Sequence, residues 1–134
     1  MRKTLFQTAL LAVLAAPAAH PALADGGVTV ALPDQGQIAR AASEAFLHEL
    51  VLANVVGMNC QDYLISNGEW ALIVGSADLV AAALKLEVND YDDRFYGPAF
   101  AALDAPGTCQ AEGPKIAGLI ERLKAMGGDT VPLG

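Results

Sequence analysis

Apolar and polar positions recur with helical spacing over most of the chain. In the segment 35–58, polar side chains recur every three or four positions, at Gln37, Arg40, Glu44 and His48. Apolar side chains occupy the opposite face, and beyond residue 49 the segment is apolar nearly all round. Such a pattern is typical of an amphipathic helix that becomes buried. We therefore predict one helix over 35–58, with Asp34 as its N-cap.

A second long helix is predicted to begin after residue 66. Ser66 is followed three residues later by Glu69, which is the pattern of a capping box. Apolar residues then recur at helical spacing from Trp70 to Leu84, so they fall on one face. Gly75 is a candidate break within this helix.

Two more helices are predicted in the C-terminal half. The segment 86–93 is polar and predicts a connection, and the aromatic and apolar residues from 95 to 103 predict a helix interrupted near Gly97-Pro98. The last helix opens at Pro114 and runs to residue 126, with its apolar side chains on one face.

The first 24 residues have the pattern of a secretory signal peptide. Arg2 and Lys3 precede an apolar run over 5–16, and Ala22-Leu23-Ala24 offers small residues at the cleavage positions. The run is too short for a membrane span. We predict cleavage near Ala24, a periplasmic or secreted protein with no membrane span in its mature form, and a single domain over 25–134.

The predicted fold class is all-α, a small bundle of about four helices closed by one disulfide. The segment 25–33, in which Val28 and Val30 alternate with other residues, predicts an extended arm without an evident partner strand. Cys60 and Cys109 are the two cysteines, and an even count in an oxidising compartment indicates a disulfide. A redox or metal-binding thiol pair is the alternative, although the chain has no CxxC motif.

The charge of the predicted mature chain limits its partners. Without Arg2 and Lys3, six of the 8 basic residues remain against 15 acidic ones, a formal charge of −9 instead of −7. Nucleic acids and anionic lipids require clustered Lys or Arg, so neither is an expected partner. A cationic partner is left open.

The densest polar feature is the acidic cluster of Asp90, Asp92 and Asp93. Converging carboxylates suit calcium, but an EF-hand loop begun at Asp90 would place Arg94 and Phe95 at positions that require a ligand and a glycine. We interpret the cluster as a solvated helix N-terminus and predict no metal site.

Catalytic patterns are weak. His48 lies next to Glu49 and is a conceivable general base or pH sensor, but no nucleophile accompanies it in the sequence. The chain has no GxSxG, HExxH or glycine-rich phosphate motif. We therefore predict a non-enzymatic protein without a cofactor, in which His48 lies on the solvent-exposed surface.

Most aromatic side chains are predicted to pack in the core. Tyr91 and Tyr96 are the best candidates for exposure. Together, Tyr91, Tyr96, Asp90, Asp92 and Asp93 form the predicted binding surface.

The segment 57–64, Gly-Met-Asn-Cys-Gln-Asp-Tyr-Leu, resembles the HdeA/HdeB family of periplasmic acid-stress chaperones, and the resemblance extends over 57–126. It implies a small exported helical protein that is dimeric and inactive at neutral pH and that exposes apolar surface to unfolding clients in acid. In that case Cys60 and Cys109 would tether the aromatic-bearing helices, and carboxylates such as Asp62, Asp90, Asp92 and Asp93 would lose charge. The helix predicted over 35–56 and the scarcity of lysine depart from the family.

Two functional hypotheses follow for a non-enzymatic exported protein. The first is a pH-responsive chaperone-like stress protein, whose partners are unfolded client proteins. The second is a small binding module or inhibitor that acts on one envelope protein. Protonation of all carboxylates, His48 and the new amino terminus would bring the formal charge to about +8, which permits a rearrangement in acid. A homo-oligomer is compatible with either hypothesis.

Overall fold

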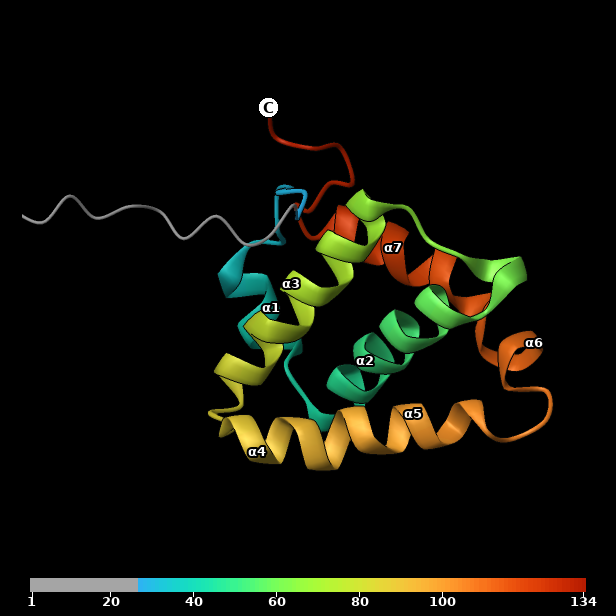
Figure 1. Cartoon of the computed structure of the whole chain (residues 1–134). Coiled ribbons are helices and arrows are strands. Elements are labelled where there is room, and N and C mark those ends of the chain that lie inside the picture. Colours follow the sequence, from blue (N-terminus) through green and yellow to red (C-terminus); the bar gives the residue numbers. More distant parts are fainter. Residues whose placement is uncertain (1–26) are drawn as a thin grey trace, which may run out of the picture.

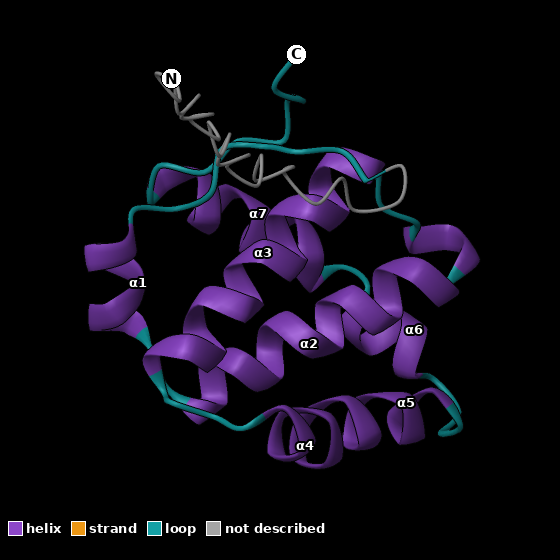
Figure 2. Cartoon of the chain, turned by 60° about the vertical axis from the view of Figure 1, so that its left-hand side comes forward, coloured by secondary structure: helices purple, strands orange, loops and turns teal. Residues whose placement is uncertain are grey.

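A computed structural model describes residues 27–134. The predicted signal peptide and the first two residues of the predicted arm lie outside the described residues. The helices are α1 (Gln35–Ala41), α2 (Glu44–Asn59), α3 (Asn67–Ala83), α4 (Val88–Tyr91), α5 (Gly97–Leu103), α6 (Thr108–Glu112) and α7 (Lys115–Ala125), with a 3₁₀ turn η1 (Gln61–Tyr63) and a π-helical turn η2 (Asp92–Tyr96). The predicted all-α class is confirmed (Figures 1 and 2).

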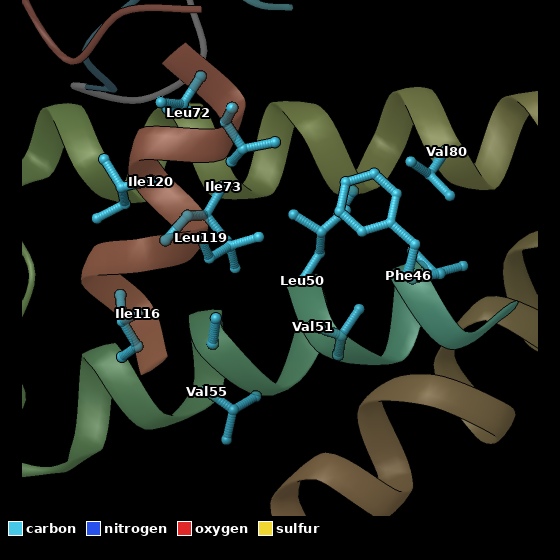
Figure 3. Packing of buried hydrophobic residues seen from close by; sticks show 14 of the residues in the cluster. Phe46, Leu50, Val51, Val55, Leu72, Ile73, Val80, Ile116, Leu119 and Ile120 are labelled. Atoms are coloured by element: carbon cyan, nitrogen blue, oxygen red, sulfur yellow. The ribbon is translucent and has the colours of Figure 1, made fainter. Parts of the chain in front are cut away.

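Helix α2 lies at the centre of the core. Residues 53–57 are all buried, and five consecutive residues at about 100° each cover every side of a helix. Figure 3 shows Phe46 and Leu50 of α2 directed toward side chains of α3 and α7, while Val55 projects from the opposite side of α2. The core residues labelled there are Phe46, Leu50, Val51 and Val55 from α2, Leu72, Ile73 and Val80 from α3, and Ile116, Leu119 and Ile120 from α7.

The helix predicted over 35–58 is two helices, so that prediction was wrong in its continuity. The chain leaves the helical conformation at Ala42 and Ser43, and α2 begins afresh. The Ser43 side chain accepts a hydrogen bond from the Phe46 backbone N–H at 3.0 Å. A serine that caps its own helix competes with continuation of the preceding one.

Helix α3 is continuous through Gly75, and its predicted capping box is present. Ser66 accepts from the Glu69 backbone N–H at 3.2 Å, and the Glu69 carboxylate accepts from the Ser66 N–H at 2.7 Å. A Cβ on Gly75 would lie 2.5 Å from Leu32 Cδ2. Gly75 therefore allows the extended N-terminal segment to approach the helix and does not interrupt it.

Residues 88–103 form one continuous helical segment, made of α4, η2 and α5, which we call the aromatic helix (Figure 1). The predictions of a connection over 86–93 and of a break at Gly97-Pro98 were wrong. Instead, the Gly97 N–H bonds to the Asp92 carbonyl, five residues back. A proline in an α-helix clashes with the carbonyl four residues earlier. The wider π turn before Pro98 leaves room for its ring and keeps the helix intact.

The extended N-terminal segment has a partner that the sequence did not reveal. Val30 forms an antiparallel bridge with Pro132, and the Leu133 N–H donates to the Thr29 carbonyl at 2.8 Å. The segment and the C-terminal residues therefore lie side by side. Between residues 27 and 134, no helix is long and apolar enough to cross a bilayer.

The predicted disulfide is confirmed. Cys60 follows the last turn of α2, Cys109 lies in α6, and their Cα atoms are 5.6 Å apart. The bridge closes a loop of 49 positions and joins the end of the central helix to the segment that follows the aromatic helix.

Removing the disulfide should cost a large part of the stability. We expect the double variant C60S/C109S to lose about 4 kcal/mol of unfolding free energy, because its unfolded chain is less restricted. Guanidinium unfolding at neutral pH measures this loss, and reduction of the unmutated protein should reproduce it. Unchanged unfolding curves would contradict the expectation.

Candidate functional site

The π turn aligns three aromatic rings along the aromatic helix. Residues five positions apart in an α-helix lie about 140° apart around its axis, whereas an i→i+5 turn brings them close to one face. The ring centroids of Tyr91 and Tyr96 are accordingly 5.3 Å apart, and those of Tyr96 and Phe100 are 6.4 Å apart. We call Tyr91, Tyr96 and Phe100 the aromatic ladder.

The exposed end of this ladder is Phe100. Tyr91 and Tyr96, the predicted candidates for exposure, are each half-buried. Among the Phe, Tyr and Trp residues that the structure describes, Phe100 is the most accessible, at 53% exposure. Ala99 faces inward instead, at 6%. The sequence signal for this arrangement, which the sequence analysis missed, is Pro98. The π turn before Pro98 contains one extra residue, and that residue rotates every later side chain around the helix axis.

Side-chain hydrogen bonds anchor the ladder to two other helices. The Asn54 side-chain amide of α2 donates to the Tyr96 hydroxyl oxygen at 3.2 Å. The Tyr91 hydroxyl donates to the Asp78 carboxylate of α3 at 3.3 Å. Asn54 is only 9% exposed, and its Oδ1 atom has no hydrogen-bond partner among the described residues. The predicted site did not include Asn54 or Asp78, since only the folded chain brings them to the tyrosines.

Burial changes the acidity of the groups in these contacts. It raises the pKa of the Tyr91 hydroxyl well above its ordinary value, with smaller contributions from Tyr96 and Asp78. Burial also raises the pKa of Asp78, and the hydrogen bond from Tyr91 opposes this shift. Tyr91 therefore acts as a hydrogen-bond donor throughout the physiological pH range.

Phe95 lies on the inner side of the aromatic helix, between a histidine and an arginine. Its side chain is 1% exposed, and its ring centroid is 4.4 Å from that of His48. The Arg94 guanidinium carbon is 5.5 Å from the same centroid, and Arg94 forms an ion pair with Glu44. His48 is exposed, as predicted, and packs on Phe95.

The solvent side of the aromatic helix is acidic. Asp90, Asp92 and Asp93 are all exposed. In the part of the chain that the structure describes, no three His, Cys, Asp or Glu side chains converge as a metal site would require. The structure thus places all five predicted site residues on one helix and adds Phe100 at its outer side.

A separate groove lies between α1, α2 and α7. It has a volume of about 350 Å³ and is lined by Ala41, Ala45, Phe46, Glu49, Arg122 and Met126. The Arg122 guanidinium carbon is 5.1 Å from the Phe46 ring centroid, and Arg122 pairs with Glu49 at 2.5 Å. This ion pair joins α7 to α2 in the way that Arg94 and Glu44 join the aromatic helix to α2.

Comparison of the chain with protein-family models, curated proteins and solved structures found no match. The resemblance to the HdeA/HdeB family therefore stays a prediction based on residues 57–126.

The contact between Asp78 and Tyr91 should have a defined pH dependence. Because the folded protein binds a proton at Asp78 more tightly than the unfolded chain does, this group contributes stability in acid that is lost as the pH rises through its raised pKa. Asp78→Asn does not titrate. We therefore expect its stability relative to the unmutated protein to increase between about pH 3 and about pH 7.

Urea unfolding over this pH range measures the difference. Asp90→Asn, which removes an exposed charge from the same region, serves as the matched control. A relative stability of Asp78→Asn that falls as the pH rises would show that the hydrogen bond from Tyr91 outweighs burial.

Proposed function

We propose that this protein is an exported, non-enzymatic binding module that contacts one envelope protein through the outer side of its aromatic helix. The observation that carries the proposal is the exposure of Phe100 at the end of the aromatic ladder. Single exposed apolar residues are common on protein surfaces. Phe100 differs from these because neighbouring aromatic rings and a buried inner face hold the helix that presents it.

Rigid aromatic side chains supply a large share of binding energy at protein interfaces. The helix that carries Phe100 is held from below by Phe95 and Ala99, which are 1% and 6% exposed. The half-buried Tyr96 ring lies between Phe100 and the core. Little conformational entropy would therefore be lost when Phe100 enters a pocket on a partner.

The charge of the segment that presents Phe100 indicates the chemistry of the partner. The segment 85–104 contains the exposed acidic residues Glu87, Asp90, Asp92, Asp93 and Asp104. Its basic residues are Lys85 and Arg94, and Arg94 is paired with Glu44. A complementary surface would have an apolar pocket for Phe100 surrounded by Lys or Arg, which also accelerates association.

Three side-chain hydroxyls, those of Ser43, Ser66 and Thr108, take part in hydrogen bonds within the fold, which is compatible with a role without catalysis. Ser43 and Ser66 cap helices α2 and α3. The Thr108 hydroxyl donates to the Ala102 carbonyl at 2.6 Å.

Phe100→Ala should weaken binding without unfolding the protein. A partner recovered from envelope extracts of the source cells at neutral pH is purified and titrated with the disulfide-bonded protein. We expect Phe100→Ala to lower the affinity by about tenfold or more, because a buried aromatic contact is lost. Raising the salt concentration should slow association.

Val88→Ala is the matched control, because Val88 is 74% exposed at the beginning of the same helix. Its affinity should stay within about threefold of the unmutated protein. Equal losses of affinity in the two variants would contradict a contact centred on Phe100. Unchanged affinity in both variants would contradict it as well.

A second candidate is the acid-released, chaperone-like function. It is favoured by the enclosure of α2, whose residues 53–57 are buried on every side and which two ion pairs join to the helices that cover it. Protonation of Glu44 and Glu49 would remove both ion pairs, while the disulfide would keep the released segment attached. Exposed ion pairs contribute about 0.2–1 kcal/mol each. Their loss would loosen the bundle without unfolding it. Asp78 opposes release, because its pKa is raised in the folded protein and its protonation in acid therefore stabilises the fold.

A pH titration of the oxidised protein tests this candidate. Release predicts that helicity persists toward about pH 2 while apolar-dye binding rises reversibly. The variant E44Q/E49Q, which lacks both ion pairs, should bind dye at a higher pH than the unmutated protein. A protein that binds no dye before it unfolds, or that precipitates, would exclude acid release.

A further inference from the structure

Asn54 occupies an unusual position in the apolar helix α2. Along with Ser76, it is one of two buried polar side chains among the described residues. Its amide nitrogen donates to Tyr96, but its Oδ1 atom is buried without a partner. An apolar residue of the same shape would avoid the desolvation of this oxygen. The stability of the core therefore does not account for an asparagine at this position.

What Asn54 contributes is a directional contact with one residue of the π turn. Tyr96 is the last residue of the turn, and the Gly97 N–H that closes it bonds to Asp92. If the turn relaxed to α-helical geometry, every later residue would rotate by about 100°. Pro98 would then take the place of Ala99 against α2. Tyr96 and Phe100 would stay neighbours, because they are four residues apart, but together they would turn away from Tyr91.

Pro98 and Asn54 act on this turn in different ways. Pro98 lacks an N–H and disfavours the α-helical arrangement around its own position. It does not relate the turn to a neighbouring helix. Asn54 belongs to α2, so its hydrogen bond fixes the wide turn at the level of Tyr96 and relates the register of the aromatic helix to the core. A single buried asparagine specifies helix register in coiled coils in the same manner.

We propose that Asn54 is a positioning residue that holds the aromatic helix in its π-turn register through Tyr96 and thereby sets the direction of Phe100. The direction of Phe100 matters for function only through the proposed function, in which Phe100 contacts a partner. The register itself does not depend on any partner, so it is tested separately.

The test is amide hydrogen exchange of the disulfide-bonded variant N54L/Y96F. Replacing both hydrogen-bonding partners by apolar groups of similar shape should leave the unfolding midpoint unchanged or higher. We expect the Gly97 amide to exchange about tenfold faster, because the turn that it closes is no longer held. The Leu72 and Ile120 amides in α3 and α7 should keep their exchange rates.

Ser76→Ala is the matched control. Ser76 is fully buried in α3 and its hydroxyl has no partner among the described residues, but it makes no hydrogen bond to the aromatic helix. Its removal should leave Gly97 exchange unchanged. The single variant Tyr96→Phe, which keeps the ring, replaces the double variant if that one fails to fold, with the same expected acceleration at Gly97.

Gly97 exchange within about twofold of the unmutated rate in the folded variant would overturn the proposal. A general acceleration that includes Leu72 and Ile120 would also overturn it, because Asn54 would then act on overall stability. These results need no partner. Failure of the proposed function would appear instead as unchanged partner affinity in Phe100→Ala.

Discussion

The architecture follows from a helix whose second half has no polar face. From residue 53 to 57 every side of α2 is apolar or small, apart from Asn54, and every residue is buried. Each fully buried Val, Leu or Ile side chain contributes about 1.5–3 kcal/mol relative to its exposed state. A helix of this kind is stable only if neighbours enclose it, and here α3, α7 and the aromatic helix do so. The need to cover α2 thus determines where these three helices lie. The candidate site lies on one of them, the aromatic helix.

The aromatic helix contributes to the core and to the candidate site at the same time. Its inner side supplies Phe95 and Ala99 to the core, and Phe100 is exposed on its outer side. The π turn changes the alignment along this helix, because it brings Tyr91 and Tyr96, five residues apart, close to one face. π turns inside α-helices are frequent at functional sites, and here the turn directly precedes the part of the helix that presents the exposed ring.

Sequence patterns predicted those parts of the fold that local interactions determine. The capping box at Ser66, the apolar face of α7 and the disulfide each depend on spacing or residue type alone, and each is present. The division between α1 and α2 was missed, because the periodicity of apolar residues continues across a capping serine. The contacts of Tyr96 with Asn54 and of Tyr91 with Asp78 join residues 42 and 13 positions apart, so periodicity within one helix gives no indication of them.

The bridge between Val30 and Pro132 brings together the two places where the described chain enters and leaves the bundle. Figure 1 shows both at the top of the view, on the side opposite α4 and α5. The described ends therefore lie on the side of the bundle away from the aromatic helix. The protein could be immobilised through its C-terminal end, and the aromatic helix would remain accessible to a partner.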